Sequence, residues 1–262
     1  MKRIVFGLAA LLTAALLSLF NLQNGQDSDY FLKKAGIRVS DGDTITLSVD
    51  GEKTTVRYLL IDTPELHHPK KPVEELGEEA AAANRELLAS GPVRLEYDRE
   101  KTDKYGRTLA YVWVATPEGE VMINEELMRR GLAVPMIIQP NGKYARRILN
   151  AMEDAALHER GLWGLLARRR FTSAQIWSEA ALLAGTFITA DMTADRVQKS
   201  GRRIIVSEKS FSLVAYRDEY TEGLLALKKG DRITARGQIV LSARGVEMPI
   251  ASTFQIKVSG EP

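Results

Sequence analysis

The sequence predicts a mainly β protein with helices, of the α+β class, in which an OB-type five-stranded barrel with packed helices is followed by a second OB-like β-barrel. Two sets of five apolar runs of strand length occur, and in each set a helical stretch separates the third run from the fourth. Three strands, a helix and two further strands is the order of an OB-type barrel. With 262 residues and 45% hydrophobic content, the chain is long enough for two cores.

The first set of strands is indicated by β-branched residues and by Gly or Asp between the runs. The expected strands are 37–39, 44–49, 54–61, 93–97 and 108–115. Three expected helices accompany them, each with a stop signal: 73–89 before Gly91-Pro92, 123–130 before Gly131, and 143–160 before Gly161. Together these elements predict a first domain over residues 36–165.

A basic segment beginning with Arg168, Arg169 and Arg170 separates the two sets, and we expect 166–183 to be a linker helix. The second set then predicts an OB-like domain over 184–262. Its expected strands are 185–190, 202–207, 211–216, 232–241 and 249–258, with a short helical stretch at 218–228. The second set lacks the acidic and arginine motifs described below, so we interpret it as a binding domain.

The N-terminus has the pattern of an export signal or membrane anchor. Met1-Lys2-Arg3 precedes an apolar run over residues 4–20, which is the order that the secretion machinery recognises. No small-x-small cleavage site follows Phe20, so an uncleaved anchor is the preferred interpretation, although the run is short for a hydrocarbon core of about 30 Å. We therefore expect a signal peptide or anchor at 1–22, a linker at 23–35, and an exported protein that is membrane-anchored or secreted. With no cysteine, disulfides and thiolate metal sites are excluded.

Charge is unevenly distributed along the chain. Residues 31–165 hold 19 Lys and Arg against 22 Asp and Glu, whereas 166–262 hold 15 against 10. Since binding to a polyanion needs cationic surface, the second half is a candidate second grip on nucleic acid. The alternative is that it binds a protein or the cell envelope and that its charge is incidental.

Three short motifs carry the chemistry. They are Asp41-Gly42-Asp43-Thr44, the segment from Arg57 through Asp62-Thr63-Pro64-Glu65, and Asp103-Lys104-Tyr105-Gly106-Arg107. Each alone is also typical of an ordinary turn. Together they supply oxygen ligands for a hard divalent cation, from Asp41, Asp43, Asp62 and the carbonyl of Thr63. Two guanidinium groups, those of Arg57 and Arg107, are suited to a phosphate that gathers negative charge, and Glu65 is a candidate base.

In order, spacing and residue type, these motifs resemble the staphylococcal nuclease (thermonuclease) family, from about Ile37 to Trp163. The resemblance implies Ca²⁺ held by Asp43, Asp62 and Thr63, with Asp41 nearby through water. It implies that Arg57 and Arg107 contact the scissile phosphate and that Glu65 lies beside the attacking water. It also implies cleavage of the 5′ P–O bond, which leaves a 3′-phosphate.

The same resemblance implies the substrate contacts. Lys104 and Tyr105 match phosphate and sugar contacts, and Lys70 and Lys71, in matching connecting sequence, are further expected substrate-binding residues. One segment departs from the family pattern: residues 134–141 lack the two tyrosines that stack on the base and touch the terminal phosphate. Base stacking at the active site is therefore expected to be weaker.

The favoured function is Ca²⁺-dependent hydrolysis of DNA, RNA or both. One rival is a non-catalytic nucleic-acid-binding or scaffolding module on a nuclease-like fold; another is a periplasmic OB-fold protein that binds small ligands or proteins. A pure nucleic-acid binder gains nothing from clustered acids, which repel phosphate in the absence of a metal. No protein partner can be inferred from the sequence.

Overall fold

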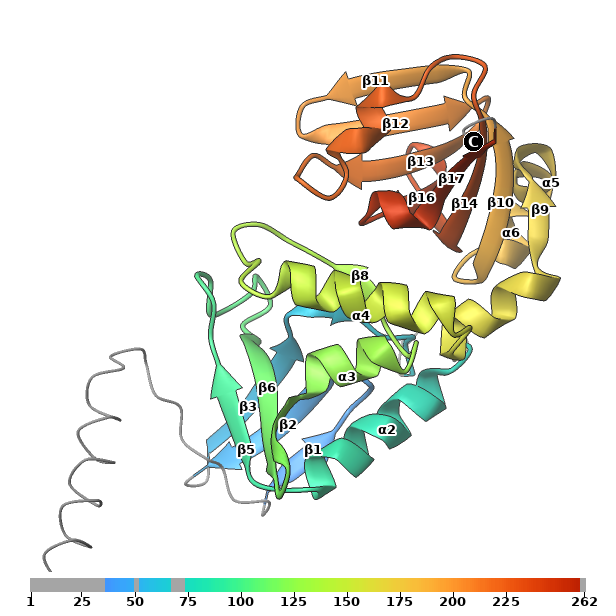
Figure 1. The fold of residues 1–262 in the computed structure, drawn as a ribbon. Coiled ribbons are helices and arrows are strands. Elements are labelled where there is room, and N and C mark those ends of the chain that lie inside the picture. Colours follow the sequence, from blue (N-terminus) through green and yellow to red (C-terminus); the bar gives the residue numbers. More distant parts are fainter. Residues whose placement is uncertain (1–35, 50–51, 67–73, 260–262) are drawn as a thin grey trace, which may run out of the picture.

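The computed structural model describes residues 36–49, 52–66 and 74–259 of the 262-residue chain. The expected signal or anchor, the linker that follows it, and Lys70 and Lys71 lie outside these residues. Across the described ranges, no helix is both long and apolar enough to cross a bilayer. Figure 1 shows a mixed structure of strands and few helices, which confirms the α+β prediction.

The first group of strands forms a six-stranded sheet. Five of its strands are neighbours in the order β1 (Ile37–Val39), β2 (Thr44–Val49), β3 (Glu52–Tyr58), β6 (Thr108–Thr116) and β5 (Val93–Glu96). The sixth strand, β7 (Gly119–Met122), pairs with β6. β3 and β6 run parallel and the other neighbours are antiparallel. The expected strands 37–39 and 44–49 have the bounds of β1 and β2.

The expected strand 54–61 is divided in two at Leu60. This residue adopts a left-handed backbone with φ 66°, so the chain turns out of β3 and continues as β4 (Leu60–Asp62). β4 pairs with β8 (Val134–Met136), a strand that the sequence did not predict because Pro135 argues against one. The break brings Leu59, Leu60 and Ile61 all into the core, which strict alternation would not allow.

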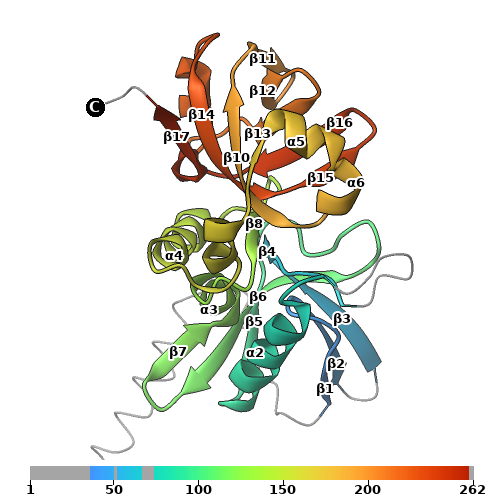
Figure 2. The ribbon, with the colours of Figure 1, turned by 90° about the vertical axis from the view of Figure 1, so that its right-hand side faces the viewer.

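Three helices pack against this sheet: α2 (Gly77–Ala89), α3 (Ile123–Arg129) and α4 (Ala145–Leu157). α4 is helical because apolar residues recur at helical spacing, and Ile148, Met152 and Ala155 on that stripe are fully buried. All three helices begin or end within four residues of the predicted bounds. They cover the sheet on the side that also holds β4 and β8 (Figures 1 and 2).

The segment expected as a linker helix contains a strand as well. A 3₁₀ helix, η1 (Gly161–Arg168), leads into β9 (Arg170–Thr172), α5 (Ser173–Ser178) and α6 (Ala180–Leu183). β9 pairs in parallel with β10 (Phe187–Thr193), so part of this segment belongs to the second group of strands. Thr172 and Gln175 form a reciprocal capping box, which explains why α5 begins at Ser173.

The second group of strands forms two sheets around a core of its own. One has the order β17-β14-β10-β9 and the other β11-β12-β13-β16-β15. The strands are β11 (Arg196–Ser200), β12 (Arg203–Glu208), β13 (Phe211–Tyr216), β14 (Arg232–Gln238), β15 (Val240–Ser242), β16 (Gly245–Ile250) and β17 (Ile256–Ser259). β13 runs parallel to β16, and the 3₁₀ helices η2 (Glu222–Ala226) and η3 (Thr253–Gln255) lie before β14 and β17. Two residues separate β10 from β11, so the chain passes from the first of these sheets to the second between these strands.

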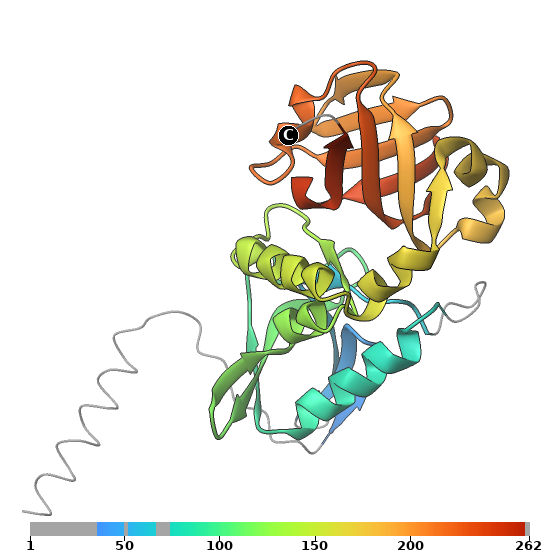
Figure 3. The same cartoon turned by 45° about the vertical axis from the view of Figure 1, so that its right-hand side comes forward.

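The two groups of strands meet at an aromatic junction. Trp163 packs edge-on against Phe187 with ring centroids 5.0 Å apart, and Phe187 belongs to the first core although it begins β10, a strand of the second group. The Arg236 guanidinium lies 5.6 Å from the Trp163 ring centroid and 5.3 Å from that of Phe254. Figure 3 shows the second group directly above α4 and the segment that follows it.

Candidate active site

Two acidic turns meet beside α2. Asp43, immediately before β2, is buried, and its Oδ2 accepts a hydrogen bond of 2.7 Å from the amide of Thr63, which follows β4. Gly42 permits this approach: a Cβ there would lie 2.7 Å from the side chains of both Thr63 and Ala80. The close contact therefore requires glycine between the two acids of the first motif.

Arg57 lies between the two carboxylates that the sequence assigned to the metal. Its Nη1 is 2.9 Å from Asp43 Oδ2 and its Nη2 is 2.5 Å from Asp62 Oδ1. Nη1 also donates to the carbonyls of Tyr58 and Ile61, at 3.0 and 2.8 Å. Arg57 is only 9% exposed, so it is a buried, fully paired arginine and not an outward-facing one.

The acids of this cluster carry more negative charge than one guanidinium can balance. Burial raises the pKa of the Asp43 carboxyl to about 7, Arg57 opposes that rise, and the charges of Asp62 and Asp41 add to it. Burial likewise raises the pKa of Asp62, with Arg57 opposing and neighbouring acids, including Glu65, adding to it. A bound cation would offset this excess, so the charge of the site favours one.

The donor atoms suit a hard cation. Carboxylate oxygens of Asp43 and Asp62 and the carbonyl of Thr63 are the ligand types that Ca²⁺ takes. Asp41 turns toward its own backbone, with Oδ1 accepting from the Asp43 amide at 3.2 Å. In the part of the chain that the structure describes, no three acidic, His or Cys side chains are grouped closely enough to hold a metal by themselves. The remaining ligands would have to be the carbonyl and water.

Glu65 is held beside this cluster by its backbone. Its amide donates to Glu74 Oε2 at 3.1 Å and its carbonyl accepts from the Glu74 amide at 3.0 Å. Its charge acts on Asp62, as noted above, which places the Glu65 carboxylate within electrostatic reach of the proposed metal ligands. No motif in the sequence predicted that Glu74 would contact Glu65.

Arg107 lies on a separate loop that Asp103 organises. Asp103 Oδ1 accepts from the amides of Tyr105 and Arg107, both at 2.9 Å, and its Oδ2 lies 2.8 Å from Arg107 Nε. Burial tends to raise the pKa of Asp103, but these hydrogen bonds from Arg107 and Tyr105 lower it below its usual value. No role was predicted for Asp103 from the sequence, although an acid four residues before an arginine indicates a possible ion pair between the two side chains.

The loop also presents the two expected substrate contacts. Tyr105 is 72% exposed, and its ring centroid lies 4.9 Å from Lys104 Nζ and 5.6 Å from the Arg107 guanidinium carbon. The loop enters β6 at Thr108, and Leu109 of that strand is the register partner of Arg57. The loop thus begins beside the strand that carries the buried arginine.

The segment without tyrosines lies next to Arg57. Met136 Sδ is 4.0 Å from Arg57 Nη2, Met136 is 39% exposed, and Ile138 is 64% exposed. At this edge of the site the segment therefore presents Met136, which has no aromatic face.

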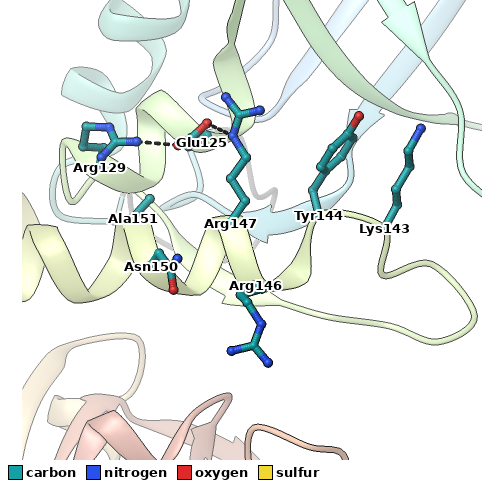
Figure 4. A pocket seen from close by; sticks show the side chains of 8 residues that line it. All are labelled: Glu125, Arg129, Lys143, Tyr144, Arg146, Arg147, Asn150 and Ala151. Atoms are coloured by element: carbon teal, nitrogen blue, oxygen red, sulfur yellow. Dashed lines mark hydrogen bonds and ion pairs between the residues drawn. The ribbon is translucent and has the colours of Figure 1, made fainter.

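A basic hollow lies on the solvent side of α3 and α4, with a volume of about 510 Å³. Figure 4 shows Arg129 and Arg147 both directed at the Glu125 carboxylate, with Arg146 near the start of α4 and Lys143 and Tyr144 on the segment just before it. We call it the α4 hollow. None of the predicted catalytic or metal-binding residues lines it.

Comparison with known proteins identifies relatives of the first part of the chain. Residues 55–164 match a family model described as staphylococcal nuclease homologue. The thermonuclease of Staphylococcus hyicus is 39% identical over 171 residues, which cover 62% of this chain and 99% of the relative. The thermonuclease of Staphylococcus intermedius is 38% identical over 174 residues, with the same two shares. Endonuclease YncB of Bacillus subtilis (strain 168) is 41% identical over 139 residues, 51% of this chain and 64% of the relative.

Proposed function

This chain belongs to the staphylococcal nuclease family and is a nuclease, and from that premise we propose that it hydrolyses phosphodiester bonds in DNA, RNA or both with Ca²⁺, leaving 3′-phosphate ends. The observation that supports this best is the buried cluster in which Arg57 joins Asp43 and Asp62. Such a cluster has donors for a hard cation and a guanidinium for phosphate in one place.

In this proposal Asp43, Asp62 and the Thr63 carbonyl hold the cation, with Asp41 joined through water. When bound, Ca²⁺ supplies a charge that polarises the phosphoryl oxygens and neutralises the transition state. Arg57 is joined to both carboxylates in this structure, and with a cation balancing Asp43 and Asp62 an Nη donor of Arg57 would be available to a phosphate oxygen.

The bond change follows from the roles of the remaining residues. Glu65 orients the water or accepts its proton, and the water oxygen bonds to phosphorus. The P–O5′ bond breaks and the phosphate stays on the 3′-oxygen. The proton lost by the attacking water passes to solvent, directly or through Glu65, and the 5′-oxygen that leaves takes a proton from solvent water. Arg107 holds the equatorial oxygens, which gather charge, while Lys104 and Tyr105 bind the adjoining phosphate and sugar. Lys70 and Lys71 are kept as proposed substrate contacts.

We also propose the division of the chain into a catalytic domain at 36–165 and an OB-like domain at 184–262. Residues 1–22 are proposed to export the chain and to retain it at the membrane, so that it meets extracytoplasmic Ca²⁺ and nucleic acid. The basic residues Lys2 and Arg3 and the apolar run over residues 4–20 support the proposal.

The rival is a non-catalytic module that binds nucleic acid through the same fold. The buried acids count against it, because without a cation they repel phosphate. Digestion of a 5′-labelled oligonucleotide with Ca²⁺ or with EDTA separates the two proposals. We expect cleavage only with Ca²⁺, and products whose mobility changes when a phosphatase removes the 3′-phosphate. Cleavage in EDTA, or products with a 3′-hydroxyl, would contradict the proposed chemistry.

A further inference from the structure

The positive charge of the C-terminal region is concentrated on three neighbouring strands. Residues 196–217, which span β11, β12 and β13, contain six Lys and Arg against one acid, whereas the rest of 166–262 contains nine of each. The whole surplus of the region therefore lies on this meander, the top layer in Figure 1. Arg196, Lys199 and Arg202 are exposed, and within the described residues none of them has an ion-pair partner.

One side of the meander packs on the core and the other faces solvent. Along β13, Phe211, Leu213 and Ala215 belong to the second core, so Ser212, Val214 and Tyr216 point the other way. Register extends this outer face across the neighbouring strands: Tyr216 pairs with Arg203, Val214 pairs with Ile205 and Pro249, and Ser207 of β12 pairs with Arg196. We call this side of β11, β12, β13 and β16 the outer face.

The outer face combines planar, apolar and cationic groups. Tyr216 is 65% exposed at one end, beside Arg203, and the next pair along the ladder, in which the Arg217 amide donates to the Arg202 carbonyl at 2.7 Å, carries two exposed arginines at the edge of this face. Arg203 is paired with Glu247 at 3.1 Å and Arg217 with Glu222 at 2.8 Å. Ile205, Val214 and Pro249 form a short apolar row, in which Val214 is buried, Ile205 is half-buried and Pro249 is exposed, with Arg196 beyond it. A ligand that fits must offer flat apolar surface and repeated negative charge.

Single-stranded nucleic acid has both properties, because its bases stack on aromatic rings while its phosphates follow cations. A duplex would hide its bases and leave Tyr216 unused. In OB-type units the face of the second and third strands is the usual nucleic-acid platform, and β12 and β13 are those strands here. Tyr216 also offers the aromatic surface that residues 134–141 of the first domain lack.

A series of contacts links the outer face to the loop before β6 that carries Arg107, which we call the catalytic loop. Four residues after Tyr216, Tyr220 lies under the Arg146 guanidinium at 5.3 Å, and Glu219 pairs with Arg146 at 3.0 Å. Arg146 lines the α4 hollow together with Lys143. The turn before Lys143 is tied to the start of the catalytic loop: Asn141 Oδ1 accepts from the Glu100 amide at 2.8 Å, and Asn141 Nδ2 donates back to its carbonyl at 3.0 Å.

We propose that the outer face binds a single-stranded segment of the substrate, with Tyr216 stacking on a base and Arg196 and Arg202 contacting phosphates. The inference rests on the proposed function for the identity of the substrate, but binding on this face requires neither metal nor cleavage.

The test measures binding by the full-length chain in EDTA, where the proposed nuclease cannot cut. The probe is a fluorescent single-stranded oligonucleotide of about 30 nucleotides, longer than the roughly 4–16 that one OB unit covers. Anisotropy gives Kd across a salt series for wild type, Tyr216→Leu and the double variant Arg196→Gln/Arg202→Gln. The matched control is Lys228→Gln/Lys229→Gln, which removes two exposed charges of the same region away from the outer face. Thermal unfolding of each variant checks the fold.

We expect Tyr216→Leu to raise Kd about 5- to 160-fold, the range for losing one stacked base. The double arginine variant should flatten the slope of log K against log salt by roughly 1.4, since each lost single-strand phosphate contact removes about 0.7. The control should keep a wild-type Kd for the oligonucleotide. Equal Kd and slope in all four folded proteins would overturn the proposal.

Partition of the same proteins onto phosphatidylserine vesicles tests whether the outer face binds lipid headgroups in place of nucleic acid. If the outer-face variants lose vesicle binding while their oligonucleotide Kd is unchanged, the face binds lipid headgroups and the proposal is wrong. If oligonucleotide binding weakens as expected in a protein that shows no Ca²⁺-dependent cleavage, the proposed chemistry fails but the binding face stands.

Discussion

Arg57→Ala is expected to impair stability and catalysis together, because the guanidinium has a structural role in addition to its proposed contact with phosphate. The side chains of Arg57 and Asp43 are 11% and 6% exposed, so this pair is shielded from solvent, whereas Asp62 is 37% exposed and counts for less. Removing one partner of a buried pair typically costs about 3–5 kcal/mol. With urea m-values of about 1–3 kcal/mol/M, the unfolding midpoint should fall by roughly 1–5 M in EDTA.

The matched variant is Arg107→Ala. Its pair with Asp103 is partly exposed, at 34% and 16%, and pairs near the surface contribute at most about 1 kcal/mol. Both variants should lower kcat by about 10²–10³, the scale for one transition-state donor. Urea unfolding with EDTA and with Ca²⁺, beside steady-state cleavage, measures both effects, and Ca²⁺ should partly restore the stability of Arg57→Ala because a cation replaces the lost charge.

Two results would refute this reasoning. An Arg57→Ala protein that unfolds at the wild-type urea concentration in EDTA would mean that the buried ion pairs do not stabilise the fold. A folded Arg57→Ala protein with wild-type kcat would remove Arg57 from the catalytic assignment.

Three further predictions concern the metal, the turn and pH. Activity should require Ca²⁺ at about 10⁻⁴–10⁻³ M, with Mg²⁺ a poor substitute because it demands tighter octahedral geometry; a Ca²⁺ and Mg²⁺ titration of cleavage checks this, and best activity with Zn²⁺ would contradict it. Gly42→Ala should raise the Ca²⁺ concentration for half-maximal activity, since its Cβ would lie 2.7 Å from the side chains of Thr63 and Ala80. The control Gly142→Ala should not raise it, because that Cβ would be 3.5 Å from its nearest neighbour. Equal Ca²⁺ requirements for the two variants would refute the close-contact argument. Burial tends to raise the pKa of Asp98, but hydrogen bonds from the Tyr111 hydroxyl and nearby amides lower it below its unfolded value. Its stabilising contribution is therefore complete above an unfolded pKa of about 3.9 and lost as pH falls through the folded pKa. The difference in unfolding free energy between wild type and Asp98→Asn should shrink below pH of about 4, and a constant difference down to pH of about 2 would be the contrary result.

Much of the fold was predictable because local patterns agree with the tertiary structure. β1, β2 and β13 have the predicted bounds, since each is a β-branched or aromatic run between turn residues. β11 was missed because an exposed edge strand with the sequence Arg-Val-Gln-Lys-Ser has almost no apolar signal. β9 was missed because three residues become a strand only when β10 lies beside them.

The candidate site was predictable as a set of residues but not as an arrangement. Order and spacing identified Asp43, Asp62 and Arg57, yet alternation along one strand could not decide which way Arg57 points. The left-handed backbone at Leu60 removes that alternation and brings the carbonyl of Ile61 to Arg57. The sequence does not indicate a left-handed backbone at Leu60, because leucine rarely adopts that conformation.

The packing of Phe187 into the first core has a consequence for how cleavage products are spaced. Because this side chain and Trp163 join the two groups of strands, the second group is held in place and is not on a flexible tether. A flexible tether would let the outer face bind the substrate at many distances from the cleavage site. Here a nucleic-acid strand bound on the outer face would reach the catalytic loop after a fixed number of nucleotides, so cleavage would favour fragments above a set minimum length. Substitution of Phe187 by alanine would let the two groups of strands move relative to each other and would broaden the distribution of fragment lengths.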